Sequence, residues 1–186
     1  EVAYGTTVER LRFDDGHVRA VIAAAPAGGE REIACDAVVV ASGGFEANIE
    51  WLRRYWGDAV DNYLVRGTPH NDGRVLASLL DAGVAQKGNP KGFHAVAIDA
   101  RSPRFDGGIV TRVDSIPFGI AVNRDGERFY DEGEEIWPKR YATWGGLIAR
   151  QPGQLAYSIF DSKAAGRFIP PLYPPFEAAN VAELAA

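Results

Sequence analysis

The apolar run Val38–Ala41 is the clearest hydrophobic signal in the chain, and it ends abruptly at Ser42, Gly43 and Gly44. An apolar run of this length that ends in glycines predicts a buried, parallel strand followed by a tight turn. Two glycines at the carboxyl end of a strand let another group approach the backbone closely, and open α/β sheets bind ligands at such positions. The turn is therefore either a ligand-binding edge or a plain strand-to-helix connection.

Alternating apolar and polar residues precede this run. They predict strands over residues 2–12 and 18–25, joined at Asp14-Asp15-Gly16, which is an Asp-Gly hairpin signal. A further turn at Pro26–Gly29 leads through residues 31–35 to the apolar run. The first 48 residues are thus expected to form a small β-meander.

After residue 48 the hydrophobic pattern takes the period of helices, and Asp72 and Gly83 supply capping signals for one of them. The prolines of residues 170–175 exclude regular structure there. The sequence predicts an α+β fold with a boundary near residue 48. The expected elements beyond it are helices over 50–56, 71–83 and 139–149, strands over 116–123 and 155–160, and a turn over 123–129.

Composition and charge exclude several functions. With 46% hydrophobic and 24% charged residues the chain is globular, and its net charge of -5 argues against nucleic-acid binding. It has no bilayer-length apolar stretch and no signal peptide, so we expect a cytoplasmic protein. The lone Cys35 and the irregularly spaced acidic run Asp131–Glu135 fit no metal site. Because the chain contains no Met, we also expect a piece of a longer polypeptide.

Short motifs occur along the chain in a fixed order. They are Ala41–Asn48, Asn71–Gly73, Val122–Phe129 and Tyr157–Asp161. Together they resemble the flavoprotein family of fumarate reductase and succinate dehydrogenase. The resemblance implies a fragment of an FAD-binding domain over residues 1–48, containing the β-meander and the Ala-Ser-Gly-Gly strand end. It also implies a truncated capping domain of the same flavoprotein type over residues 49–186.

Within this family the chain is similar to the tricarballylate dehydrogenases, on the segments Val65–Pro69, Phe105–Arg112 and Arg128–Glu134. That similarity implies hydride transfer from a small polycarboxylate substrate to FAD. It also implies an electron-acceptor protein, and leaves open whether that partner is membrane-associated. The Gly-x-Gly-x-x-Gly loop that holds the FAD pyrophosphate in the family does not occur in these residues. Residues 1–186 alone are therefore expected to bind FAD poorly and to be inactive.

The resemblance also assigns catalytic and substrate-binding roles. Arg140 stands where the family has its proton-donating Arg, with Lys139 as a rival and an exposed helix residue as the alternative. Thr111 and Arg112 match a Thr-Glu pair of the family, whose Thr binds a carboxylate, so Arg112 stands in place of an acidic residue. Alternatively, Arg112 is a charge on the surface of a strand. His94 matches a substrate-binding His, or is a packed His.

Cofactor-side roles follow from the same resemblance. Val8 is expected to lie near the adenine, and Ser42, Gly43 and Gly44 near the flavin, mainly through backbone groups. Asp72 matches the acidic residue that opens a helix in the family. No residue is assigned to a metal.

Neighbouring positions complicate this picture. Ser115 stands where the family carries an Arg of the proton path, which puts that path in doubt. Arg66 and His70 could line the substrate cleft, or could be exposed loop residues.

Three other functions remain open at this stage. The first is the flavoprotein part of a cobalamin-pathway enzyme that acts on precorrin-3. The second is a non-catalytic binding module with the shape of the cap. The third is a relative of the ketosteroid dehydrogenases, which would need a Tyr-lined apolar cleft rather than an arginine-rich one.

Overall fold

The computed structural model describes residues 1–134 and 137–185, and for residues 137–139 it describes the backbone alone. The Lys139 side chain, the rival of Arg140, lies outside this description. The chain forms two compact units. The first unit comprises Glu1–Tyr55 and Pro69–Lys91, and the second comprises Trp56–Thr68 and Gly92–Ala186. The assignment of residues 1–48 to an FAD-binding domain and of 49–186 to a cap stays a prediction.

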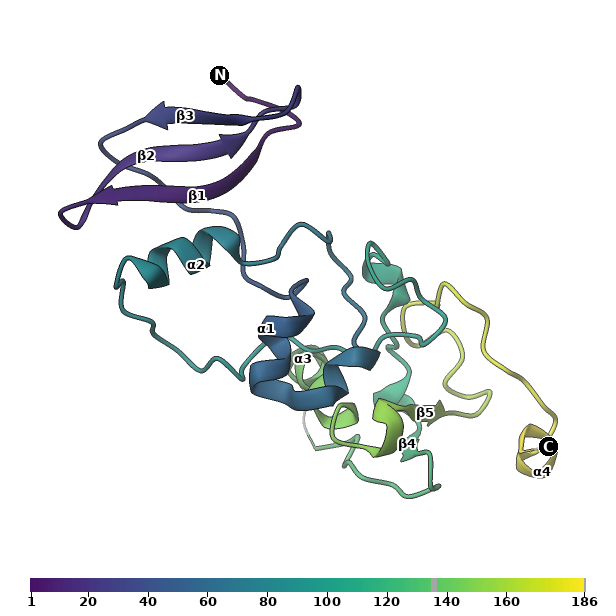
Figure 1. Ribbon diagram of the computed structural model, residues 1–186. Coiled ribbons are helices and arrows are strands. Elements are labelled where there is room, and N and C mark those ends of the chain that lie inside the picture. The colour runs from purple at the N-terminus through teal and green to yellow at the C-terminus, as the bar shows by residue number, and fades with distance from the viewer. Residues whose placement is uncertain (135–136, 186) are drawn as a thin grey trace. The chain divides into compact units, whose positions relative to one another are not determined.

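A three-stranded antiparallel sheet begins the first unit (Figure 1). Its strands are β1 (Thr7–Asp14), β2 (His17–Ala24) and β3 (Glu30–Ala34), in the order β1-β2-β3. Asp15 and Gly16 join β1 to β2 with φ values of 48° and 71°, which are the left-handed values of a two-residue hairpin turn. The predicted β-meander is confirmed.

Helix α2 (Arg74–Asp81) packs against β1. Val75 on the helix and Leu11 on the strand are both buried, and the Leu11 backbone N–H donates to Ser78 Oγ at 3.2 Å. The helix begins after Gly73, whose φ of 82° suits a glycine and where a Cβ would lie 2.5 Å from Trp51 Cζ3. This contact fixes the entrance to α2 against the ring of Trp51.

The apolar run Val38–Ala41 does not form the predicted buried strand. It is extended chain without strand pairing, and 96% of Val39 is exposed. A strand requires a neighbour to satisfy its backbone N–H and C=O groups, and a parallel strand is normally covered on both faces. Among the described residues no strand pairs with this run, so its apolar character finds no burial there.

Helix α1 (Ile49–Trp56) follows, as predicted. Asn48 caps it, because its Oδ1 accepts a hydrogen bond from the Trp51 N–H at 2.9 Å. The chain then leaves the helix at Gly57, with a φ of 63°, and forms a 3₁₀ segment over Gly57–Asn62. The helix end expected from the glycine is confirmed.

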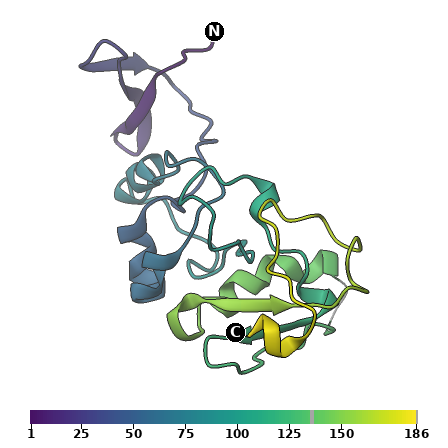
Figure 2. The same ribbon diagram turned by 90° about the vertical axis from the view of Figure 1, so that its right-hand side faces the viewer.

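The second unit contains helix α3 (Trp137–Ile148) and a two-stranded antiparallel sheet of β4 (Ile120–Asn123) and β5 (Ala156–Ile159) (Figure 2). Its core is formed by side chains of α3 and β4 and of the segments between residues 97 and 130. The buried members are Ala97, Ile116, Ala121 and Trp144, and Val113, Phe129, Tyr130, Tyr141 and Ile148 pack against them.

Local structure in the second unit departs from the predictions at two places. Residues Ile116–Phe118 form a 3₁₀ turn rather than the start of a strand, because Pro117 has a fixed φ and no N–H for a sheet. A short helix, α4 (Val181–Leu184), forms where none was predicted. Residues 170–175 are irregular, as expected from their prolines.

The second unit also contains two short 3₁₀ segments, Ile109–Thr111 and Pro152–Gln154.

None of the described helices has the length and apolar character needed to cross a membrane.

Adjacent glycines of α3 give a matched test of this packing. A Cβ on Gly145 would lie 2.4 Å from the Val96 carbonyl oxygen, whereas the nearest atoms to a Cβ on Gly146 are at 4.0 Å. Gly145→Ala should lower the free energy of unfolding by about 1–3 kcal/mol through overpacking. Gly146→Ala should raise it by about 0.5–1 kcal/mol, because Ala favours the helix. Urea denaturation measures both changes, and equal effects would contradict the packing described.

Candidate functional site

In the first unit, Gly43 lies against the loop that opens α2. Its φ is 78°, and a Cβ there would lie 3.0 Å from Asn71 Nδ2. Asn71 is itself held by Glu46, because Nδ2 donates to Oε1 at 2.6 Å, and the Asn71 carbonyl accepts from the Ala47 N–H at 3.0 Å. The glycine turn and the helix entrance therefore form one local structure, in which position 43 requires a glycine.

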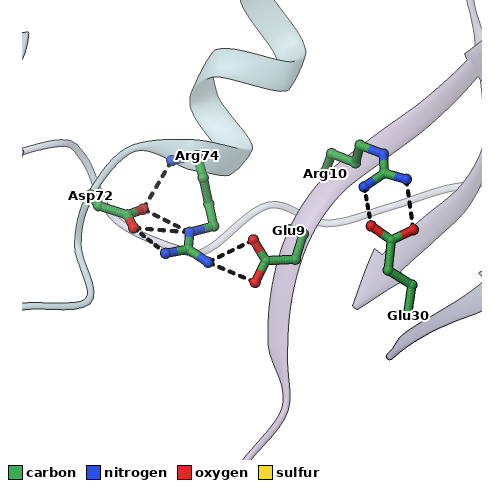
Figure 3. A network of polar contacts seen from close by, with 5 residues as sticks. All are labelled: Glu9, Arg10, Glu30, Asp72 and Arg74. Carbon is green, nitrogen blue, oxygen red and sulfur yellow. Dashed lines mark hydrogen bonds and ion pairs between the residues drawn. The ribbon is translucent and has the colours of Figure 1, made fainter. Parts of the chain in front are cut away.

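Asp72, at this helix entrance, is fixed by the guanidinium of Arg74 (Figure 3). Arg74 Nε donates to both Asp72 carboxylate oxygens at 3.0 and 2.9 Å, and Nη1 donates to both Glu9 oxygens at 2.8 Å. The hydrogen bonds from Arg74 hold the pKa of Asp72 below its usual value. Asp72 is thus an ionised acceptor, and Arg74 links it to β1 at the residue that follows Val8.

The first unit thus brings together the cofactor-side residues predicted from the sequence. Ser42 and Gly43 are exposed, so their backbone groups are accessible to a ligand, and Gly44 and Val8 are half-buried. Backbone donors without side-chain bulk suit close approach by a planar ring system. The described contacts do not test the roles assigned to these residues, which stay predictions.

In the second unit, Arg112 and Asp114 form a buried ion pair. Arg112 Nε donates to Oδ1 at 2.6 Å and Nη2 donates to Oδ2 at 2.8 Å, with 8% and 2% of the two side chains exposed. These hydrogen bonds raise the pKa of Arg112, which keeps its charge. Arg112 is therefore not a strand-surface charge, the alternative considered from the sequence.

Tyr141 connects this ion pair to His94. The Arg112 guanidinium carbon lies 4.5 Å from the centre of the Tyr141 ring, and the ring centres of Tyr141 and His94 are 5.2 Å apart. His94 is exposed, so it is not the packed residue of the alternative. The cluster thus extends from a surface imidazole through an aromatic ring to a buried cation.

Thr111 lies beside Arg112 in the chain and is 1% exposed. Its Oγ1 donates to the Gly108 carbonyl at 2.8 Å, so the hydroxyl hydrogen is used to hold the glycine loop. The oxygen retains acceptor capacity but not its donor. Carboxylate binding by Thr111 stays a prediction.

Sequence reasoning assigned no role to Asp114 or to Tyr141. The spacing of Arg112 and Asp114 was an available signal, because residues i and i+2 of an extended segment share a face. Arg112 does adopt extended backbone, with φ −69° and ψ 138°. Nothing in the local sequence indicated that Tyr141 would stack on that arginine.

Arg66 is half-buried in the same unit, whereas His70, which lies in the first unit, is exposed. Burial and the nearby charge of Arg112 lower the pKa of Arg66. Among the described residues its buried Nη1 has no hydrogen-bond acceptor. The cluster therefore contains a guanidinium group that its described neighbours do not satisfy.

Arg140, the predicted catalytic residue, has described contacts on the segment before α3. Its Nη2 lies 2.5 Å from Glu134 Oε2, and its Nε donates to Tyr130 OH at 3.2 Å. With 28% of its side chain exposed, Arg140 is not a freely solvated helix residue. The described contacts do not test its catalytic role. An open pocket of ≈ 460 Å³ lies on this segment, lined by Arg128, Phe129, Tyr130 and Asp131.

The acidic run beside this pocket has a structural role. Glu132 is 3% exposed, forms an ion pair with Arg128, and accepts the Ala121 N–H at 2.5 Å. Burial raises the pKa of the Glu132 carboxyl, but its hydrogen bonds, including the one from Arg128, outweigh this effect, and the pKa lies below its usual value. Among residues 1–134 and 137–185, no group of three or more His, Cys, Asp or Glu side chains could hold a metal ion.

The sequence profile of the FAD binding domain family matches residues 1–159. Three solved structures share the fold. A flavocytochrome c3 fumarate reductase in an open conformation is 22% identical, with a TM-score of 0.62, over 87% of this chain and 27% of that one. A 3-ketosteroid-Δ4-(5α)-dehydrogenase from Rhodococcus jostii RHA1, in complex with 4-androstene-3,17-dione, is also 22% identical, with a TM-score of 0.58, over 86% and 29%.

A 3-ketosteroid Δ1-dehydrogenase from Sterolibacterium denitrificans, in complex with 1,4-androstadiene-3,17-dione, is 19% identical, with a TM-score of 0.62. The match covers 86% of this chain and 29% of that one. This chain therefore spans less than a third of the length of the solved proteins that it resembles. At these identities the likeness establishes a common fold.

The buried ion pair provides a stability test with a matched control. Asp114→Asn leaves the Arg112 charge buried without its carboxylate, and should lower the free energy of unfolding by about 3–5 kcal/mol. Glu30→Gln removes a carboxylate from Arg10 at the surface, where 52% and 55% of the two side chains are exposed, and should change stability far less. Urea denaturation compares them. A loss for Asp114→Asn no larger than that for Glu30→Gln would contradict the buried pair.

Proposed function

The chain belongs to the FAD binding domain family, and from that premise we propose that the whole protein is an FAD-dependent oxidoreductase that dehydrogenates a small polycarboxylate, with tricarballylate as the candidate substrate. FAD is the cofactor of this family, in line with the sequence resemblance. The observation that supports the substrate class is the cationic cluster of Arg66 and Arg112 beside the exposed ring of His94.

The charge of this cluster supports an anionic substrate. Within the described part of the chain, the two guanidinium groups are accompanied by the carboxylate of Asp114, which already accepts two hydrogen bonds from Arg112. In a partly dry environment such an excess of positive charge attracts carboxylates more strongly than it would in water. An uncharged steroid would instead leave the shielded Nη1 of Arg66 without an acceptor among the described residues.

Residues of the first unit would hold the cofactor. The backbones of Ser42, Gly43 and Gly44 would lie against the flavin, with Asp72 at the same edge and Val8 toward the adenine. When bound, FAD supplies a hydride acceptor. The protein's own contribution there is a close-packed backbone edge, held by Asn71 against the glycine turn.

Residues of the second unit would bind and orient the substrate. His94, Thr111 and Arg112 would hold its carboxylates, which fixes the carbon that loses a hydride. Arg140 would give a proton to Glu134 Oε2, which lies 2.5 Å from its Nη2, and so could accept the proton that the substrate loses. A guanidinium keeps its protons in ordinary surroundings, so this relay depends on the carboxylate at its side.

Electrons would then leave the flavin for an acceptor protein of the same cell compartment. A cytoplasmic location, and the question whether that acceptor is membrane-associated, stay predictions from the sequence.

The substrate class is tested with purified full-length protein loaded with FAD. Tricarballylate should bleach the flavin absorbance under anaerobic conditions, because hydride transfer reduces the ring. A precorrin-3 and 4-androstene-3,17-dione serve as competing candidates. Reduction by precorrin-3 alone would favour the cobalamin-pathway alternative, and reduction by the steroid alone would reject the cationic cluster as the substrate site. A flavin that no candidate reduces would favour a non-catalytic binding module.

The role of Arg140 is tested in the same protein. Arg140→Gln should lower kcat by at least about 10²-fold, the usual contribution of a positioned proton-transfer group, while the visible spectrum of the bound flavin stays unchanged. Arg167→Gln, at an exposed position of the same unit, is the matched control and should keep full activity. Unchanged turnover in Arg140→Gln would exclude it from proton transfer.

A further inference from the structure

Arg66 lies on a segment that is anchored by backbone hydrogen bonds on both sides. The Val65 N–H donates to the Arg104 carbonyl at 2.7 Å, and the Asp106 N–H donates to the Gly67 carbonyl at 3.0 Å. This pairing holds the backbone around Arg66 against the loop before Thr111. The backbone from which the Arg66 side chain projects is therefore fixed by the fold.

The buried end of this side chain has an unmet requirement. Among the described residues Nη1 has no hydrogen-bond acceptor, and the atom is shielded from solvent. Buried donors in folded proteins nearly always have an acceptor, and a charged donor without one is costly. A neutral residue at this position would avoid this cost.

Among the described residues, three groups act electrostatically on Arg66, and none of them accepts a hydrogen bond from Nη1. They are Arg112, Tyr141 and Asp114. Both carboxylate oxygens of Asp114 accept from Arg112, at 2.6 and 2.8 Å, so its charge is already committed. Arg112 is itself a cation and repels Arg66. Counted over the described residues, Arg66, Arg112 and Asp114 together carry one positive charge in excess.

A loop of small residues lies beside this excess charge. The Gly108 N–H donates to the Arg66 carbonyl at 3.4 Å, and Thr111 Oγ1 fixes the same loop through the Gly108 carbonyl. At Gly107 a Cβ would lie 3.2 Å from Thr111 Cγ2, so a larger residue would crowd the loop. The backbone next to Arg66 is thus kept free of side-chain bulk.

We propose that Arg66 is a carboxylate-binding residue, distinct from Arg112, and that it selects a substrate with an additional carboxylate group. The planar guanidinium fork matches a carboxylate through two parallel N–H···O bonds, and an anion at Nη1 satisfies both the missing acceptor and the excess charge. The identity of the anion as a substrate carboxylate rests on the proposed function. The unmet donor itself does not.

The test uses the full-length holoenzyme and two ligands that differ by one carboxylate, tricarballylate and glutarate. Arg66→Gln should weaken tricarballylate binding by about 10- to 100-fold, the usual range for a charge-assisted hydrogen bond. Glutarate affinity should change several-fold less, because glutarate lacks the group that Arg66 binds. Isothermal titration calorimetry measures both affinities, and Arg167→Gln should leave both unchanged.

A second variant and a turnover assay separate the possible results. Arg66→Lys keeps the positive charge but loses the planar pair of N–H donors, so it should lose part of the preference for tricarballylate over glutarate. If Arg66→Gln does not fold, Arg66→Lys tests the role of Arg66 in its place. Equal weakening of both ligands, or none, overturns the role of Arg66. If tricarballylate binds in an Arg66-dependent manner but never reduces the flavin, the anion site stands and the proposed function fails. If tricarballylate is oxidised with the same KM in wild type and Arg66→Gln, the proposed function stands and this inference fails.

Discussion

A buried guanidinium requires a carboxylate, and the second unit is arranged around that requirement. Only 8% of the Arg112 side chain is exposed, and its ion-pair partner is Asp114 on the same extended segment. Tyr141 from α3 covers the cation, so the helix is fixed to the segment that carries the pair. Asp114 accepts two hydrogen bonds from Arg112, so its attraction for Arg66 is shared with that cation, and among the described residues Nη1 of Arg66 has no acceptor. One local ion pair thus sets the position of the helix, the polarity of the cluster and the unmet charge beside it.

In the first unit a more exposed arginine, Arg74, has the same role of holding segments together through ion pairs. Arg74 bonds to Glu9 on β1 and to Asp72 before α2, and so ties the hairpin to the helix entrance. The glycine turn at Gly43 is held next to this entrance through Asn71. In each unit an arginine joins parts of the chain that are distant in sequence, and a predicted binding residue lies beside it. Neighbouring parts of a candidate site are thereby held by charge as well as by packing.

Local chemistry explains which predictions succeeded. The hairpin at Asp15-Gly16 was predictable because only a few residue types adopt two consecutive left-handed conformations. The end of α1 at Gly57 was predictable for a similar reason. The run Val38–Ala41 failed because an apolar sequence predicts burial without identifying what covers it, and no described strand pairs with it. For the site, Arg112 and His94 were found through a family resemblance, whereas the partner Asp114 was not.

The sequence by itself determined helices α1, α2 and α3, the Asp15-Gly16 hairpin, the short strands of the meander, and a family resemblance consistent with the FAD binding domain match. These features depend on neighbours a few residues apart. Only the tertiary structure decided that Arg112 is buried with Asp114 under Tyr141, and that Arg66 has a shielded donor without a described acceptor. Burial and desolvation of a charge depend on which distant segments surround it. A residue's type gives its possible chemistry, and its packing decides whether that chemistry is already satisfied or remains available to a ligand.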